Sequence, residues 1–311
     1  MAEFNHYTVM KNEAVDALEC TNGKIYVDCT LGGGGHSELI LKRISPDGKL
    51  IAFDIDDDAI NYASEKLKEY NNLTIVRNSY ANIKQVLSEL GIEKITGGVL
   101  FDLGASYHQL TKQERGFSFS KEAPLDMRFN QNQDFSAYDV VNTYSEEDLV
   151  RIFSEYGEEH FSKRIAKEIV SKRKLKNINT TTELSELIID CTPHIKSKIH
   201  PATRVFQALR IEVNHELQNV KDTLTDILDL LGYGAIISVI SFHSLEDRIV
   251  KQIFKYYSVR CHCDKTQMIC NCPPPILELV NKKPIVASEE EIKANPPSRS
   301  AKLRIARCIR K

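Results

Sequence analysis

The sequence predicts an α/β fold in which a parallel β-sheet carries helices on both faces and is interrupted by a helical insertion. Three observations support this prediction. The first hundred residues alternate short apolar runs with segments of helical spacing, residues from about 110 to 200 show little strand pattern, and an apolar strand pattern returns at Ala235–Ser241. Alternating strands and helices are typical of parallel sheets, because the chain must cross back over the sheet between neighbouring strands.

The N-terminal part supplies four predicted strands and three predicted helices. Buried strands are short apolar runs bounded by turn residues, and we therefore predict strands at Lys24–Leu31, Lys49–Ile55, Leu73–Val76 and Gly97–Leu103. Apolar residues at helical spacing predict helices at His36–Ile44, Asp56–Tyr70 and Ala81–Leu90. The second of these helices begins with an acidic cluster, which the positive end of a helix dipole favours.

The helical insertion is predicted at residues 110–200, between a first part of the α/β domain at 1–109 and a second part at 201–311. Within the insertion we predict helices at Glu146–Phe153, Phe161–Lys172 and Thr182–Asp190. After it we predict a strand at Ala235–Ser241, a helix at Leu245–Tyr257 and a basic strand at Lys302–Ile309. A segment rich in Cys and Pro lies between that helix and the last strand.

The composition is that of an ordinary globular protein. The chain has 311 residues, of which 42% are hydrophobic and 27% charged, with a formal net charge of -2. A net charge near zero excludes a global basic field, so any contact with nucleic acid must come from local patches. We see neither a signal-peptide pattern nor an apolar run of membrane-spanning length. We therefore predict a cytoplasmic protein without a membrane partner, with its eight cysteines reduced.

A glycine-rich loop after the first strand is the sharpest local feature. Gly32–Gly35 let the backbone approach a ligand closely, and the helix that follows presents free N–H groups to an anionic group. Asp54 ends the second strand, where a carboxylate can accept hydrogen bonds from ribose hydroxyls. The loop lacks the lysine of a P-loop and the last glycine of G-x-G-x-x-G, so spacing favours S-adenosylmethionine modestly over NAD. Asp28 suits the ammonium group of that cofactor.

Further motifs follow along most of the chain. They are Asp102–Ser106 (DLGAS) with Gln109, Arg115–Phe119 (RGFSF), Pro124–Arg128 (PLDMR), His200–Arg210 (HPATRVFQALR), Ile240–Arg248 (ISFHSLEDR) and Asn295–Arg304 (NPPSRSAKLR). In this order they closely resemble the bacterial MraW family, the 16S ribosomal RNA cytosine-N4 methyltransferases. The resemblance extends from His6 to Arg304.

The resemblance implies a class I S-adenosylmethionine-dependent methyltransferase fold (Rossmann-like) with an inserted helical domain that recognises the substrate. The implied substrate is a decoding-centre cytosine of 16S ribosomal RNA within the small ribosomal subunit. The family's cofactor-binding positions correspond here to Gly34, Gly35, His36, Asp54, Tyr80, Asp102 and Gln109. Two departures are visible: Ala105, Tyr107 and His108 alter the segment after Asp102, and Pro297 stands where the family often has Arg.

Asp102 is the candidate catalytic residue. It ends the fourth predicted strand, where its carboxylate could hold the amino hydrogens of the cytosine during methyl transfer. The alternative is that Asp102 contacts only the cofactor, because the chain lacks the Asn/Asp-Pro-Pro-aromatic motif of many amino-methyltransferases at this place. A flipped base would stack on an aromatic side chain, and Phe117, Phe119 and Phe242 are the candidates.

Candidate RNA-binding residues lie in the motifs and in two basic runs. The motif residues are Arg128, His200, Arg204, His243, Arg299 and Arg304. One run comprises Lys163, Arg164, Lys167, Lys172, Arg173, Lys174 and Lys176. The other comprises Arg299, Lys302, Arg304, Arg307, Arg310 and Lys311. Basic runs are also typical of solvated surfaces, so phosphate binding and simple solvation both stay open.

Three points are left open by the sequence. Cys261, Cys263, Cys270 and Cys272 form two Cys-x-Cys pairs, but typical zinc sites have two or more residues between paired cysteines. We therefore expect free thiols and no metal, with zinc as the alternative. A non-catalytic, S-adenosylmethionine-binding ribosome-assembly factor is the alternative to an enzyme. The oligomeric state stays open, a dimer included.

Overall fold

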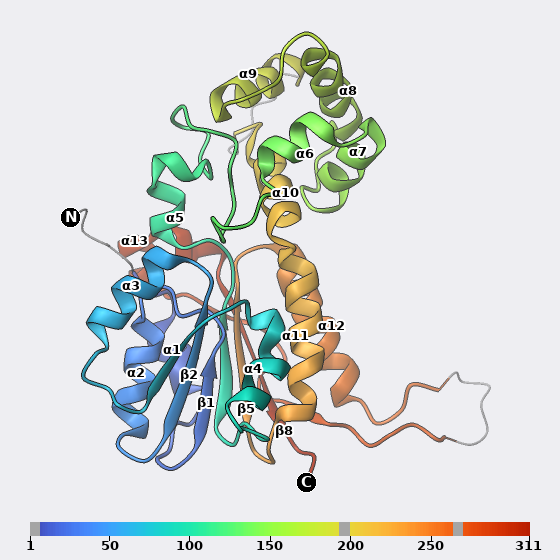
Figure 1. The fold of residues 1–311 in the computed structure, drawn as a ribbon. Helices are drawn as coiled ribbons and strands as arrows, with labels where there is room; N and C mark the ends of the chain where they lie inside the picture. The colour runs from blue at the N-terminus through green and yellow to red at the C-terminus, as the bar shows by residue number, and fades with distance from the viewer. Residues whose placement is uncertain (1–6, 193–199, 264–269) are drawn as a thin grey trace. The chain divides into compact units, whose positions relative to one another are not determined.

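The computed structural model describes residues 7–192, 200–263 and 270–311 (Figure 1). The chain forms two compact units. The sheet unit comprises residues 1–104 and 217–311, and the helical unit comprises residues 105–216. The first is an α/β unit built on a central, mostly parallel sheet, as the sequence predicts.

The sheet unit is built on one mixed sheet in the order β3-β2-β1-β4-β5-β8-β6, with β7 paired to β8. Strands β1 to β5 run parallel, whereas β8 is antiparallel to β5, β6 and β7. The strands are β1 (Ile25–Asp28), β2 (Lys49–Asp54), β3 (Leu73–Arg77), β4 (Gly98–Asp102), β5 (Ile236–Ser241), β6 (Leu277–Leu279), β7 (Ile285–Val286) and β8 (Lys302–Cys308). Asp28, Asp54 and Asp102 therefore end three neighbouring parallel strands at the same edge.

Helices cover both faces of this sheet because neighbouring strand residues point to opposite sides. Tyr26 is buried in the core with α1, α2 and α3, and Val27 is buried in the core with α4, α11 and α12 (Figure 1). The helices of the unit are α1 (Lys11–Asp16), α2 (Gly35–Ile44), α3 (Asp57–Lys66), α4 (Ile83–Glu89), α11 (Glu216–Leu230), α12 (Ser244–Ser258) and α13 (Glu289–Ala294), with 3-10 turns η1 (Tyr80–Asn82) and η3 (Pro296–Ser300).

The helical unit has its own core, formed around Val140, Phe153, Ile165, Leu184 and Leu209. Two of its helices begin at polar caps, where a side-chain oxygen satisfies a free backbone N–H: Ser145 caps α7 and Thr180 caps α9. The unit contains α5 (Tyr107–Thr111), η2 (Gln113–Arg115), α6 (Ala137–Thr143), α7 (Glu146–Glu155), α8 (Ser162–Arg173), α9 (Thr181–Cys191) and α10 (Thr203–Asn214).

The predicted strands and helices are all present, with ends shifted by a few residues. The helical unit differs from the predicted insertion, residues 110–200, because it begins at Ala105 and extends to Glu216. It extends further because α10 buries Val205 and Leu209 in the same core as α7. The sequence patterns above do not predict α10 or α11. Residues 193–199 of the predicted insertion lie outside the described residues.

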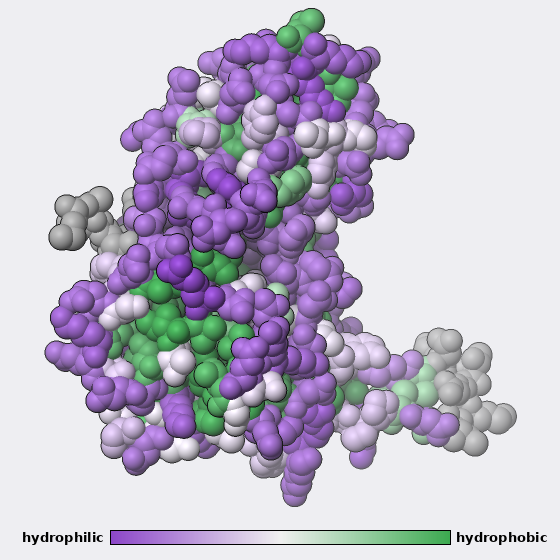
Figure 2. Space-filling view, viewed as in Figure 1, coloured by the Kyte–Doolittle hydropathy of each residue, from purple (hydrophilic) through white to green (hydrophobic). Residues whose placement is uncertain are grey.

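The visible surface is mostly hydrophilic, and hydrophobic residues gather over the sheet of the sheet unit (Figure 2). Strand β3 is at the edge of that sheet, and all its residues are half-buried or exposed. Among the described residues, no helix combines the length and the apolar character needed to span a membrane.

Candidate functional site

The glycine-rich loop joins β1 to α2 and is shaped by two glycines. Gly34 has φ 69°, in the left-handed region that favours glycine, and it precedes α2 without a side-chain cap. A Cβ atom on Gly35 would lie 1.8 Å from the Thr8 hydroxyl oxygen. The first turn of α2 therefore keeps its backbone N–H groups available for an anionic ligand.

Asp28, at the end of β1, holds this loop in place by hydrogen bonds. Its side chain is fully buried. One carboxylate oxygen accepts the Thr30 backbone N–H at 3.0 Å, and the other accepts the Ser37 hydroxyl at 2.7 Å. Burial raises the pKa of Asp28, and these two hydrogen bonds oppose that rise. The sequence suggested Asp28 for the cofactor ammonium, but the structure places it as an internal brace of the loop.

Asp54 braces the same loop from β2. Its Oδ2 accepts the Gly32 backbone N–H at 2.8 Å. Its Oδ1 accepts the backbone N–H groups of Ile55 and Asp56 at 2.8 and 2.9 Å. Burial raises the pKa of Asp54 to about 6, despite these hydrogen bonds. Each carboxylate oxygen can accept more than one hydrogen bond, so Asp54 retains capacity for ribose hydroxyls.

Asp102 at the end of β4 is the carboxylate whose hydrogen bonding is incomplete. Its Oδ1 is buried without a hydrogen-bond partner, and its Oδ2 lies 3.8 Å from His36 Nδ1. Burial raises the pKa of Asp102 well above its usual range, and the carboxylates of Asp28, Glu246 and Glu291 add to the rise. Buried polar atoms without partners are uncommon, and a buried anion is stabilised by a cation. The site therefore fits a positively charged hydrogen-bond donor.

Two other predicted cofactor residues lie in the sheet unit, and one lies outside it. His36 is buried on α2, and its Nε2 donates to the Val9 carbonyl at 3.1 Å. Tyr80 follows β3 and packs edge-on against Phe101, with ring centroids 5.7 Å apart. Gln109 belongs to the helical unit, where its side chain accepts the Ser106 backbone N–H and caps α5.

In the helical unit, the predicted substrate residues differ in how freely they face solvent. Arg128 forms a two-pronged ion pair with Asp126, at 3.0 and 2.7 Å, and lines a cavity of about 260 Å³ with Tyr138. His200 is exposed and stacks on Phe119, with ring centroids 4.4 Å apart. Arg204 is half-buried on α10.

In the sheet unit, His243 Nε2 lies 3.1 Å from the buried carboxylate of Glu246. Arg304 is 9% exposed and forms a two-pronged ion pair with Asp247 at 2.6 and 3.2 Å. Arg299 in η3 is exposed. Of these three predicted substrate residues, Arg299 is the one that presents an exposed cationic side chain.

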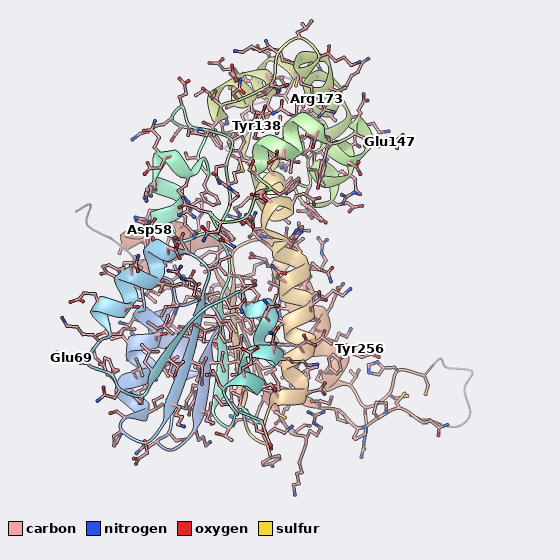
Figure 3. All side chains as sticks on the ribbon, in the orientation of Figure 1. Asp58, Glu69, Tyr138, Glu147, Arg173 and Tyr256 are labelled. Carbon is pink, nitrogen blue, oxygen red and sulfur yellow. The ribbon has the colours of Figure 1, made fainter. Side chains whose placement is uncertain are left out.

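The two basic runs differ in how many of their side chains are paired with acidic residues. On α8 and its C-cap, Lys163, Lys167 and Lys174 are exposed and share one face, being four and seven residues apart. Arg173 instead donates to the backbone carbonyls of Val141 and Tyr144 and holds the unit together (Figure 3).

The C-terminal run is largely neutralised by acidic side chains. Lys302 and Arg304 face Asp247, Arg307 pairs with Glu19, and Arg310 lies 3.6 Å from Asp229. Acidic side chains far away in the sequence therefore fold against four of the six cations of this run.

Comparison with known proteins gives the chain's relatives. The sequence matches the MraW methylase family over residues 3–309. The chain belongs to the MraW methylase family. Curated relatives include ribosomal RNA small subunit methyltransferase H of Clostridium botulinum (strain Loch Maree / Type A3), 50% identical over 99% of this chain and 100% of that protein. The enzyme of the same name from Caldicellulosiruptor bescii is 52% identical over 97% of this chain and 99% of its own.

Among solved structures, an rRNA methylase from Streptococcus thermophilus is similar to this chain, and the alignment covers 96% of this chain and 95% of that protein. Its TM-score is 0.43 and its sequence identity 10%. Membership of the MraW family confirms the resemblance seen in the motifs. Membership of this family implies S-adenosylmethionine as the cofactor, and the site fits it. The uncapped start of α2 suits the methionine carboxylate, and the unpartnered Asp102 oxygen suits a cationic group of the cofactor.

Three residues that support the loop were not among the predicted site residues. Thr30 accepts the Asp102 backbone N–H at 2.7 Å and so ties β1 to β4. Ser37 and Thr8 contact Asp28 and Gly35. Thr30 and Ser37 flank the glycines in the sequence and could have been found there. Thr8 could not, because only the fold brings it against α2.

Proposed function

We propose that this protein transfers a methyl group from S-adenosylmethionine to the N4 amino group of a decoding-centre cytosine in 16S ribosomal RNA. Its family and the names of its relatives support methylation of small-subunit ribosomal RNA. Our proposal adds that the target is a cytosine in the decoding centre of the small subunit, that the methyl group is added to its N4 atom, and that the protein acts in the cytoplasm.

The observation that carries the proposal is the buried, unpartnered Oδ1 of Asp102 beside the glycine loop. S-adenosylmethionine brings an ammonium and a sulfonium group, so it supplies the cation that a buried carboxylate lacks. In our proposal Asp102 binds the ammonium, the backbone at Gly34 and Gly35 binds the methionine carboxylate, and Asp54 binds the ribose hydroxyls. Tyr80 and His36 line the same edge of the sheet.

The main catalytic requirement of this reaction is that the protein aligns the cytosine amino group with the methyl group of the cofactor. The methyl group of a sulfonium is already electrophilic, whereas the cytosine N4 lone pair is delocalised into the ring. Catalysis then depends on holding N4 in line with the methyl group, and alignment alone can contribute about 7–11 kcal/mol to lowering a barrier. A second role for Asp102, accepting a hydrogen of the amino group, is the alternative to ammonium binding.

We assign substrate recognition to the helical unit. To reach the methyl donor, the cytosine must unstack from its neighbours in the RNA and stack instead on an aromatic side chain. Phe119 and the exposed His200 form an aromatic surface of this kind. Phe117 is less suited because it is buried and stacks on Phe129. The exposed lysines of α8 supply positive charge for phosphates.

The test is transfer of a tritiated methyl group from labelled cofactor to purified small subunits that lack the modification, followed by nucleoside analysis. We expect N4-methylcytidine from small subunits and none from large subunits. Binding of the cofactor without transfer to either would favour the non-catalytic assembly factor. A labelled cytosine methylated at a ring carbon would refute the N4 assignment while leaving the enzyme class intact.

A further inference from the structure

The connection between α12 and β6, residues 259–276, is long and holds half of the chain's cysteines. Its described arms, residues 259–263 and 270–276, extend away from the sheet beyond the end of α12 (Figure 1). Its base is closed by a backbone hydrogen bond from Ile276 to Tyr257 at 2.9 Å. His262 stacks on Tyr256 of α12, with ring centroids 4.1 Å apart, so this arm of the connection is anchored to a helix.

The four cysteine sulfurs of this connection converge on one point. The Sγ atoms of Cys261, Cys263, Cys270 and Cys272 all lie within 4.8 Å of one another. Cys261 and Cys270 are 3.4 Å apart, and Cys263 and Cys272 are 3.5 Å apart. A disulfide requires about 2.05 Å, whereas four sulfurs around a tetrahedral zinc ion at about 2.3 Å are about 3.8 Å apart. The spacing is that of a metal site.

Backbone N–H groups point at two of the sulfurs. His262 N–H donates to Cys272 Sγ at 3.2 Å, and Cys263 N–H donates to Cys261 Sγ at 3.4 Å. Such hydrogen bonds stabilise the thiolate form, and metal ligands are commonly held in this way.

The exposure of the cluster excludes ordinary core packing as its explanation. Cys261 and Cys270 are exposed, whereas Cys29, Cys191 and Cys308 elsewhere in the chain are buried. Free cysteines are normally among the most buried residues. Four thiols that meet at one point, two of them exposed and two half-buried, therefore need another reason to be together.

We propose that Cys261, Cys263, Cys270 and Cys272 bind one zinc ion. Four thiolates in tetrahedral array favour zinc, and because they fill all four positions the ion is structural, leaving no open position for a substrate. The ion joins the two arms of the connection and offsets the entropy cost of ordering so long a loop. The short Cys-x-Cys spacing predicted free thiols. In the fold the two pairs, one from each arm, come together, and their spacing in the sequence does not show this.

The experiment measures metal content by mass spectrometry in the full chain, purified without chelator. We expect about one zinc per chain. The double variant Cys263→Ser/Cys272→Ser should lose it, and Cys20→Ser, at a half-buried cysteine outside the cluster, should retain it. Cobalt exchanged into the wild type should give the charge-transfer bands of a tetrahedral tetrathiolate site.

A second measurement does not depend on the variants folding. In the wild type, zinc should protect the peptide bond after the exposed Arg260 from trypsin, and a chelator should speed its cleavage severalfold. Three results would overturn the proposal: two disulfides among the four cysteines by intact mass, iron in place of zinc, or four thiols that stay titratable after equimolar zinc is added.

Discussion

At the scale of single residues, the site is organised by carboxylates that end neighbouring strands, and their surroundings give them different tasks. Asp28 and Asp54 accept hydrogen bonds from the loop, whereas Asp102 keeps one buried oxygen unpartnered. A carboxyl whose pKa is raised by folding destabilises the fold as pH rises from its unfolded value, about 3.9, towards its folded value. Burial of Asp102 therefore lowers the stability of the cofactor-free fold, and in our proposal binding of the cofactor offsets this cost.

The first prediction is that Asp102→Asn raises the melting temperature at pH 8 and weakens binding of S-adenosylhomocysteine by about tenfold or more. A charge-assisted hydrogen bond is worth about 1.5–3 kcal/mol, and the amide removes the charge that is costly to bury. Asp247→Asn is the matched control. The ion pair with Arg304 lowers the pKa of Asp247 although burial opposes it, so its loss should reduce the melting temperature. Equal destabilisation by both variants would contradict the assignment.

The second prediction concerns pH. Because the pKa of Asp54 in the cofactor-free protein is about 6, protonation should remove its charged hydrogen bonds to the ribose as pH falls through 6. The affinity for S-adenosylhomocysteine should therefore be lower at pH 5 than at pH 7.5. Asp54→Ala should weaken binding by about 1.5–3 kcal/mol at pH 7.5 and reduce this pH dependence. Titration calorimetry gives both quantities, and an Asp54→Ala variant with unchanged affinity would exclude ribose binding.

At the scale of elements, the sequence patterns predict the central strands well but miss several helices, the long α10 and α11 among them. Strands β1, β2, β4 and β5 are buried apolar runs with clear boundaries. The signal for α11 was present, since Val220, Leu224 and Ile227 recur at helical spacing and are buried.

The site was predictable in part. The loop glycines and Asp54 stand out in the sequence, but the approach of His36 to Asp102 depends on the strand order, which no local pattern carries. The neutralisation of the C-terminal run depends on Asp247, Glu19 and Asp229 in the same way.

The third prediction tests the close contact at the start of α2. Gly35→Ala should lower the free energy of unfolding by about 1–3 kcal/mol, because its Cβ would collide with Thr8. Combining it with Thr8→Gly should restore most of the loss. Gly232→Ala, whose Cβ would meet its nearest neighbour at 3.4 Å, should change stability by about 0.5 kcal/mol or less. Urea unfolding measures all of them, and an inert Gly35→Ala would show that the contact is not tight.

At the scale of the whole molecule, the chain divides its proposed tasks between two units with separate cores. The glycine loop, Asp54 and Asp102 all lie in the sheet unit, and the basic face of α8 lies in the helical unit. A change of charge on α8 should therefore act on RNA binding alone.

The fourth prediction follows from this division. Replacing Lys163, Lys167 and Lys174 by Gln should weaken binding to small subunits and reduce the salt slope by about one for each phosphate that a lysine no longer neutralises. Cofactor affinity should stay unchanged. The control removes three exposed lysines of the sheet unit, Lys68, Lys282 and Lys283, and should keep the wild-type slope. If the control loses slope and the α8 variant does not, the RNA surface lies on the sheet unit.

The position of β8 in the sheet has a consequence for how the protein is made. β8 lies between β5 and β6, and it is the last of these strands to be synthesised. Until residues 302–308 leave the ribosome, β5 presents an open edge whose six residues are all buried in the finished fold. Such an edge is prone to pair with other chains. A nascent chain of this protein should therefore depend on chaperones until translation has passed β8, and stalling before that point should leave an aggregation-prone product.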